Sequence, residues 1–253
     1  MISSYNVHHG EEPPISGARG SGTVFFTHCN LHCVFCQNYP ISQLGVGQEK
    51  STETLARMML DLQNRGCHNI NWVTPTHFVP QILEALCLAV EGGLRLPIVY
   101  NTNGYDSLET LGLLEGVVDI YLPDMKYGDE EKSLTYSRAP AYPAVNAQAI
   151  LEMHRQVKDG RIGEDGMMKR GLIIRHLLLP NGLAGTEKIA RFVAETLSRN
   201  CPISLMTQFF PAYRAKDFPE LRRRLYRRES EEAVKILDRY RLEQGWMQEM
   251  IKN

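Results

Sequence analysis

The feature that most constrains the fold is the alternation of strand-like and helix-like runs along most of the chain. Short apolar runs rich in β-branched and aromatic residues predict strands, and apolar residues spaced three or four positions apart predict amphipathic helices. Strands that alternate with helices in this way form parallel sheets. The six predicted strands span residues 23–27, 69–73, 96–100, 117–122, 172–179 and 203–207.

The predicted helices fill the intervals between these strands. Ser51 or Thr52 is a suitable N-cap for the first helix, and Gly66 ends it. Residues 1–20 are rich in glycine and proline and are predicted to be irregular. With 253 residues and no linker-like tract, the chain is predicted to form one domain over 1–253, which a basic segment and a helix close at 214–253. The predicted helices cover residues 52–65, 79–91, 107–114, 143–158, 186–197 and 230–244.

Composition excludes several functional classes. The formal net charge is −1, which gives no electrostatic reason to expect a nucleic-acid partner. No apolar run reaches the roughly 18 residues of a membrane span. The N-terminus has no basic stretch followed by an apolar core, so we expect a cytoplasmic protein. The six cysteines fit a reducing compartment, and Cys67, Cys87 and Cys201 are predicted to be core residues.

The other three cysteines directly follow the first predicted strand. Cys29, Cys33 and Cys36 have the spacing C-x3-C-x2-C, so their thiolates can converge on one metal centre. Iron–sulfur clusters are normally held by four cysteines, and three leave one iron open for a substrate or cofactor. Zinc is an alternative with His28 or His32 as fourth ligand, although the usual second pair of ligands is missing. A disulfide knot suits small secreted chains instead.

This spacing, with Phe35 directly before the third cysteine, resembles the signature of the radical S-adenosylmethionine enzymes. The wider stretch 20–39 is similar to the branch of pyruvate formate-lyase activating enzyme-like proteins. The resemblance implies a partial (β/α)6 TIM-type barrel with parallel strands, open on one side. It also implies that the three cysteines hold a [4Fe–4S] cluster, that S-adenosylmethionine binds the fourth iron, and that Phe35 packs near the adenine.

In parallel α/β barrels, ligands bind at the carboxyl ends of the strands. Polar residues gather after each of the six predicted strands, in agreement with a site there. Arg175 and His176 are neighbours on one strand, so only one of them can point into the barrel. The predicted cofactor-binding residues are Phe35, Asn38, Thr74, Thr76, Asn101, Asn103, Asp124, Lys126, Arg175, His176 and Gln208.

Some of these positions depart from the pattern of the family. Residues 74–77 replace a Gly-Gly-Glu stretch that holds the methionyl amino group, and only the position is carried over. Asn101 replaces an acid that helps the activating enzymes hold a monovalent cation. Asp124 and Lys126 resemble an Asp-x-Lys pair whose lysine meets the methionyl carboxylate or the ribose. Tyr213 stands where related activators have a histidine.

The resemblance implies an oxidoreductase in which the reduced cluster cleaves S-adenosylmethionine to methionine and a 5′-deoxyadenosyl radical. That radical abstracts a hydrogen atom from the substrate, and no protein acid, base or nucleophile is predicted. The leading hypothesis within this class is an activase of a glycyl-radical protein, whose loop enters the open side of the barrel. A small peptide or metabolite substrate fits the same residues.

Partners and rival functions follow from the same residues. A flavodoxin or ferredoxin-type reductant is expected, and neither nucleic acid nor membrane is an expected partner. The basic run 221–228 is interpreted as a solvated helix face, since Glu229, Glu231 and Glu232 follow it, and docking of such an acidic reductant is the alternative. Two other functions stay open at this point. One is a zinc-stabilised binding module, and the other is an electron-transfer protein that uses the cluster without S-adenosylmethionine.

Overall fold

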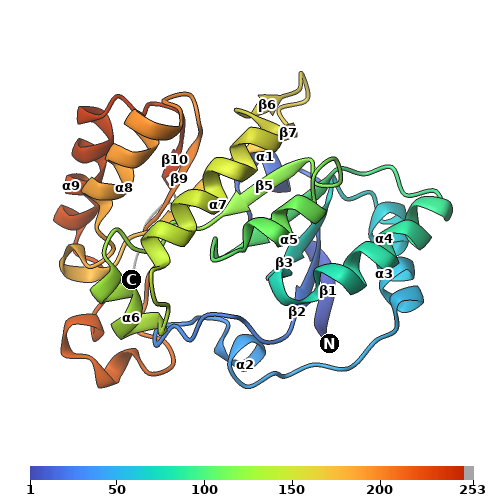
Figure 1. The fold of residues 1–253 in the computed structure, drawn as a ribbon, viewed down its shortest axis with the longest axis horizontal. Helices are drawn as coiled ribbons and strands as arrows, with labels where there is room; N and C mark the ends of the chain where they lie inside the picture. Colours follow the sequence, from blue (N-terminus) through green and yellow to red (C-terminus); the bar gives the residue numbers. More distant parts are fainter. Residues whose placement is uncertain (248–253) are drawn as a thin grey trace.

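The structure, a computed structural model, describes residues 1–247 and consists of an open α/β fold with a mainly parallel sheet (Figure 1). The strands are β1 Ile2–His8, β2 Ser21–Phe26, β3 Ile70–Val73, β4 Ile98–Thr102, β5 Ile120–Pro123, β6 Arg161–Ile162, β7 Met168–Leu172, β8 Ile174–Leu177, β9 Ile203–Met206 and β10 Gly245–Met247. The α-helices are α1 Pro13–Ser16, α2 Tyr39–Ser42, α3 Thr52–Asn64, α4 Val79–Glu91, α5 Leu108–Leu113, α6 Glu130–Ser137, α7 Tyr142–Val157, α8 Thr186–Phe192 and α9 Arg227–Arg239. Short 3₁₀ turns, η1 Thr76–Phe78, η2 Pro180–Gly182, η4 Ala215–Asp217 and η5 Pro219–Leu221, and one π-helix, η3 Val193–Leu197, complete these elements.

The predicted partial barrel is confirmed. Strands β2, β3, β4, β5 and β7 pair in parallel in chain order, and β8, β9 and β10 form a second parallel group. The predicted fifth strand, residues 172–179, contains β8 and overlaps β7 only at Leu172. A parallel bridge between Asp124 and Arg175 connects the two groups. The six predicted strands therefore correspond to β2, β3, β4, β5, β8 and β9, and the sheet does not close.

Helix positions follow the apolar periodicity of the sequence. Ser51 caps α3 by accepting a hydrogen bond from Thr54 N at 3.3 Å, and Leu55, Met59 and Leu62 are buried along one face. Helix α9 begins at Arg227 rather than at residue 230. The earlier start arises because the Tyr226 backbone N–H donates to the Glu229 carboxylate at 2.8 Å as part of a capping box.

The N-terminal segment corrects a prediction. Residues 1–20 are not irregular throughout, because Ile2–His8 is strand β1 and Pro13–Ser16 is helix α1. Strand β1 pairs antiparallel with β2, and its backbone groups find partners there although its side chains are mostly polar. The prediction for Cys87 is also wrong, because this side chain is exposed, whereas Cys67 and Cys201 are buried. Residues 248–253 of the predicted domain lie outside the described residues.

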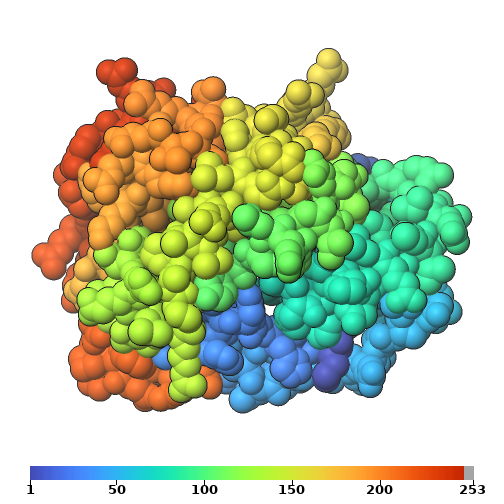
Figure 2. All heavy atoms as spheres, viewed as in Figure 1, coloured from blue at the N-terminus to red at the C-terminus, as the bar shows by residue number. Residues whose placement is uncertain are grey.

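The segment that follows β9 lies against the cysteine loop. Arg214 N donates to Val34 O at 2.8 Å, and Gln37 Nε2 donates to Gln208 O at 3.2 Å. Figures 1 and 2 show this orange segment at the lower left, beside the blue loop. Over residues 1–247, no helix is long and apolar enough to cross a membrane.

Candidate functional site

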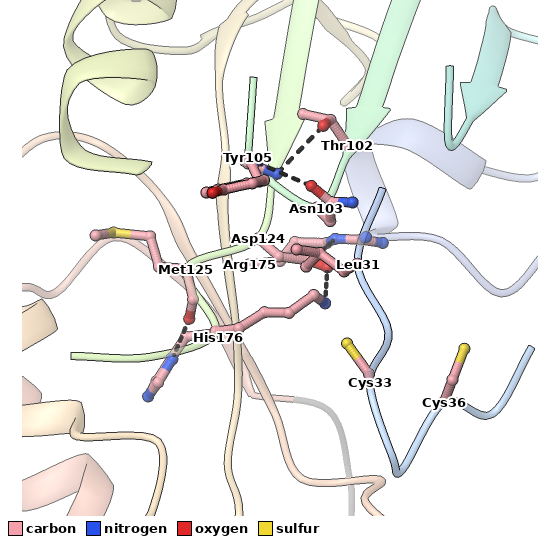
Figure 3. Close-up of polar contacts among 12 residues, drawn as sticks. Leu31, Cys33, Cys36, Thr102, Asn103, Tyr105, Asp124, Met125, Arg175 and His176 are labelled. Carbon is pink, nitrogen blue, oxygen red and sulfur yellow. Dashed lines mark hydrogen bonds and ion pairs between the residues drawn. The ribbon is translucent and has the colours of Figure 1, made fainter. Parts of the chain in front are cut away.

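The three predicted metal ligands lie on one loop between β2 and α2. Each cysteine sulfur is within hydrogen-bonding distance of a polar side chain from a different element. These pairs are Cys29 with Asn103 Nδ2 at 3.2 Å, Cys33 with Ser137 Oγ at 2.9 Å, and Cys36 with Ser42 Oγ at 3.0 Å. The thiol of Cys33 points to the side of the loop on which the side chains of Asp124 and Arg175 lie (Figure 3).

Burial controls the protonation of these thiols. It raises the pKa of Cys33 to about 12, against the opposing effect of the nearby Lys126 ammonium. Burial also raises the pKa of Cys29. Both thiols are therefore protonated at neutral pH in the absence of a metal, and metal binding must displace their protons.

Beside the cysteines lies a buried network of charged groups. Arg175 Nε donates to Asp124 Oδ1 at 2.8 Å, and the Lys126 ammonium donates to the other oxygen of the same carboxylate. Burial alone would raise the pKa of Asp124, but Arg175 and Lys126 hold it below its usual value. For Lys126, burial acts to lower the pKa, and the Asp124 carboxylate raises it above the usual value. Both groups therefore remain charged at neutral pH.

The network continues to an acid that the sequence did not single out. Glu11, in the loop between β1 and α1, lies 3.4 Å from Arg175 through its Oε2 atom. Its other oxygen accepts hydrogen bonds from Asn71 at 3.1 Å and Asn101 at 3.2 Å. Burial raises the pKa of Glu11, and Arg175 opposes this effect. Asn101 therefore contacts Glu11, and no sequence pattern pointed to this acid because it belongs to a segment predicted to be irregular.

Arg175 and His176 illustrate the alternation of a strand. Arg175 points to the charged network, whereas His176 points to the opposite side, between β8 and α8 (Figure 3). His176 Nδ1 donates to Met125 O at 2.7 Å, and Nε2 lies 2.9 Å from Thr186 Oγ1. Burial lowers the pKa of His176 to about 4. The structure therefore does not bring this predicted site residue to the cysteine loop, because neighbouring residues of a strand face opposite ways.

Thr76 belongs to a different buried cluster, centred on Asp106. This carboxylate accepts hydrogen bonds from Thr102 Oγ1 at 2.6 Å, Thr76 Oγ1 at 2.9 Å and Tyr100 OH at 2.9 Å. Burial raises the pKa of Asp106 despite these bonds. Thr74 is half-buried, two residues before Thr76. The Thr76 hydroxyl is therefore engaged in holding Asp106.

The remaining predicted residues have contrasting environments. Phe35 is buried, with its ring centroid 5.8 Å from that of Phe209 and 6.4 Å from that of Tyr127. Asn38 is exposed at the N-terminus of α2. The Gln208 Oε1 atom is buried without a hydrogen-bond partner among the described residues. A buried oxygen of this kind is available to a ligand or to water.

The two histidines considered for zinc are bonded elsewhere. His28 Nδ1 lies 3.0 Å from Thr27 Oγ1, and the exposed His32 lies 3.2 Å from Gln43 Oε1. Within residues 1–247, no three His, Cys, Asp or Glu side chains are grouped to hold a single metal ion. In a cluster each cysteine bonds a different iron, so the sulfurs are spread more widely than the ligands of one zinc ion.

A surface groove of about 730 Å³ lies apart from this site, between α8 and α9. Lys188, Arg191, Glu232 and Ile236 contribute to its lining. It shares none of its lining with the predicted site residues in the part of the chain described. The chemically distinctive side chains therefore lie at the cysteine loop and not in this groove.

Sequence comparison establishes the class of protein that this fold and site define. The model of the Radical SAM superfamily matches residues 23–195, which include the cysteine loop and all strands from β3 to β8. The chain therefore belongs to the radical S-adenosylmethionine superfamily, and the resemblance seen in the sequence is confirmed. An uncharacterised protein of Methanocaldococcus jannaschii is 33% identical over an alignment of 246 residues, which covers 94% of this chain and 67% of that protein.

Solved structures share the fold at low sequence identity. A domain of the pyruvate-formate lyase-activating enzyme from Bacteroides vulgatus has a TM-score of 0.50 at 13% identity, covering 72% of this chain and 99% of that domain. Methylornithine synthase has a TM-score of 0.57 at 15% identity, covering 87% of this chain and 62% of the synthase. The FeFe-hydrogenase maturase HydG from Carboxydothermus hydrogenoformans has a TM-score of 0.59 at 14% identity, covering 89% of this chain and 52% of the maturase.

Members of the superfamily are enzymes that generally bind a [4Fe–4S] cluster and S-adenosylmethionine. The residues of this chain fit such a group. Three sulfur donors lie on one loop, each beside a polar side chain that can stabilise a thiolate. The partly buried Lys126 ammonium opposes the effect of burial on the pKa of Cys33, so it favours negative charge at this place. These are the properties expected around an anionic cluster and a carboxylate ligand.

Proposed function

We propose that Cys29, Cys33 and Cys36 hold a [4Fe–4S] cluster and that the protein reductively cleaves S-adenosylmethionine. When bound, the reduced cluster supplies the electron that yields methionine and a 5′-deoxyadenosyl radical for hydrogen-atom abstraction. One observation carries the proposal: the cysteine loop lies beside two partly buried cations, Lys126 directly after β5 and Arg175 in β8. The match to the superfamily supports the same chemistry.

Within this proposal, Lys126 binds the methionyl carboxylate of S-adenosylmethionine. A partly buried ammonium such as that of Lys126 forms a charge-assisted hydrogen bond with a carboxylate, and Asp124 keeps Lys126 charged. Arg175 in turn holds Asp124 from the opposite side of the carboxylate. Asn103 donates to Cys29 and thereby orients that ligand. No side chain is assigned as an acid, base or nucleophile.

For the substrate, we propose a segment of another protein, such as the loop of a glycyl-radical protein. The support is the fold that this chain shares with a domain of the pyruvate-formate lyase-activating enzyme, together with a barrel that does not close. A small peptide or metabolite is the competing substrate class. Incubation with a candidate glycyl-radical protein, followed by electron paramagnetic resonance of a carbon-centred radical, distinguishes the two.

For the reductant, we propose an acidic flavodoxin or ferredoxin that docks on the segment after β9. Arg222 and Arg224 are exposed in this segment, and Arg228 is exposed in the first turn of α9. The segment contacts the cysteine loop through Arg214. Replacing Arg224 and Arg228 by Glu is expected to slow reduction by the acidic protein and to leave reduction by dithionite unchanged. An equal loss with both reductants would contradict this docking site.

The central test is anaerobic. The cluster is reconstituted, iron and sulfide are counted per chain, and 5′-deoxyadenosine is measured by mass spectrometry after reduction with S-adenosylmethionine present. Product from the natural protein and none from Cys36→Ala is the expected result. A full cluster without product would favour electron transfer, and tightly bound zinc in place of the cluster would sink the proposal.

The role of Lys126 has a separate binding test. Lys126→Met is expected to weaken S-adenosylmethionine binding by about tenfold or more, because a hydrogen bond to a charged group contributes roughly 1.5–3 kcal/mol. Isothermal titration of the reconstituted protein measures this affinity. Lys132→Met is the matched control, since Lys132 pairs with Glu131 on α6. Equal affinities in both variants would exclude Lys126 from the binding site.

A further inference from the structure

Two buried hydroxyl groups form a chain that ends on the sulfur of Cys33. Tyr127 OH lies 2.6 Å from Ser137 Oγ, and Ser137 Oγ lies 2.9 Å from Cys33 Sγ. Tyr127 is 1% exposed, Ser137 0% and Cys33 8%, so little water competes for these bonds. The three residues come from β2–α2, from the segment after β5, and from the end of α6.

The direction of these hydrogen bonds depends on the state of Cys33. A thiol can donate its proton to Ser137, which then donates to Tyr127. A metal-bound thiolate has no proton, so Ser137 must donate to the sulfur if the contact is a hydrogen bond. The Ser137 oxygen is then free to accept the proton of Tyr127. In the ligated state, both hydroxyl protons therefore point along the chain toward Cys33.

Such a chain adds partial positive charge beside one cluster ligand. A hydrogen bond to a ligand sulfur stabilises the more negative, reduced state of an iron–sulfur cluster, and it thereby raises the reduction potential. A second donor strengthens the first because hydrogen bonds in a chain polarise one another. Cys29 accepts from Asn103 Nδ2 at 3.2 Å and from Leu31 N at 3.4 Å. Cys36 lies 3.0 Å from Ser42 Oγ, which accepts from Gln43 Nε2 at 3.3 Å, but Ser42 and Gln43 are only partly buried. The chain at Cys33 differs because both of its hydroxyl groups are fully buried.

We propose that Ser137 is a positioning residue that raises the reduction potential of the cluster through Cys33, and that Tyr127 orients and polarises Ser137. This inference rests on the proposed ligation of the cluster by Cys29, Cys33 and Cys36. It assigns to α6, whose last residue is Ser137, a function in setting how readily the site accepts an electron.

The test is a redox titration of the reconstituted protein with dithionite, followed by electron paramagnetic resonance of the reduced cluster. Ser137→Ala is expected to lower the ratio of reduced to oxidised cluster at a fixed potential by up to about tenfold, which is ~59 mV for one electron. Tyr127→Phe is expected to shift the potential in the same direction but less, because Ser137 still donates to Cys33.

Ser133→Ala is the matched control. Ser133 lies on the same helix, is equally buried, and donates to the carbonyls of Glu130 at 2.9 Å and Ala139 at 2.8 Å rather than to a cysteine. It is expected to lower thermal stability without moving the potential. A potential in Ser137→Ala equal to that of the natural protein would overturn the inference.

The two proposals fail in different ways. A natural protein that assembles no cluster, by its iron and sulfide content, contradicts the proposed ligation and overturns the inference with it. A natural protein with a full cluster, whose potential Ser137→Ala leaves unchanged, contradicts the inference alone. If Ser137→Ala does not retain a cluster, Tyr127→Phe reports on the same hydrogen-bond chain. An unchanged potential in Tyr127→Phe would then overturn the inference, and a lowered one would support it.

Discussion

Two buried carboxylates follow neighbouring strands of the barrel, yet their surroundings differ. Asp124, after β5, contacts two cations, Arg175 and Lys126. Asp106, after β4, accepts hydrogen bonds from three hydroxyl groups. The pKa of Asp124 lies below its usual value and that of Asp106 lies above, although burial acts to raise both. Two full positive charges therefore outweigh the effect of desolvation on the pKa of Asp124, whereas three hydroxyl donors do not outweigh it for Asp106.

Removing Arg175, the cation that Asp124 shares with Glu11, is expected to have the largest effect on this contrast. Arg175→Met leaves Asp124 and Glu11 without their guanidinium partner. Because an uncompensated buried charge is costly, we expect the free energy of unfolding to fall by about 3–5 kcal/mol. Urea denaturation followed by circular dichroism measures this loss. Arg170→Met, at a half-buried arginine of β7 that donates to Gln156 O, is the control. A loss no larger than that of the control would show that the network is not energetically coupled.

Asp106 and Asp124 are expected to contribute to folding stability with opposite pH dependences. The pKa of Asp106 is raised above its usual 3.8, so the stability that this group contributes is present below pH 3.8 and is lost as the pH rises through its folded pKa. The pKa of Asp124 is lowered, so its contribution is present above pH 3.8 and is lost as the pH falls through its folded pKa.

Asparagine variants separate these contributions. Relative to the natural protein, Asp106→Asn is expected to gain stability as the pH rises from about 4 to about 7, because only the natural protein must then ionise a buried carboxyl group. Asp124→Asn is expected to show a deficit that is already present over this range and that shrinks as the pH falls below 3.8. Urea denaturation at a series of pH values measures both slopes. Slopes of the same sign would show that hydroxyl and cation partners act alike here.

The smallest expected effect concerns one hydroxyl of the Asp106 cluster. Thr76→Val keeps the shape of the side chain and removes one of three donors, so we expect a loss of about 0.5–1.5 kcal/mol in unfolding free energy. Thr74→Val, in the same loop, is the control. S-adenosylmethionine affinity is the second readout. If Thr76→Val weakens cofactor binding more than it weakens the fold, Thr76 contacts the cofactor rather than holding Asp106.

Local patterns were sufficient for the elements with a strong apolar periodicity. Helices α3 and α4 occupy the predicted ranges to within a residue, because their buried stripes recur at the helical period. Strand β1 was missed because its sequence, ISSYNVH, is mostly polar, and its stability derives from pairing with β2. The start of α9 was misplaced because tyrosine is an unusual residue at the N-terminal end of a capping box.

The site also contains features that are local in the sequence and contacts between residues far apart in it. The cysteine spacing and the Asp124–Lys126 pair are local, and both were recognised from the sequence. The Ser137–Cys33 contact joins residues 104 positions apart, and Glu11 meets Arg175 across 164 positions. No periodicity or motif in one segment encodes such a pair, because the contact depends on where two elements are placed by the packing of the whole chain.

By itself, the sequence determined the alternation of strands and helices and the triad of sulfur donors on one loop, because each depends on residue types at short spacing. The open parallel barrel was predicted from the family resemblance that those cysteines carry. Only the tertiary structure decided that Arg175 rather than His176 contacts Asp124 and that Glu11 contacts Arg175. It also decided that Tyr127 and Ser137 form a hydrogen-bond chain to the sulfur of Cys33. The physical reason is that strand orientation and burial set these contacts, and both are properties of the packed chain.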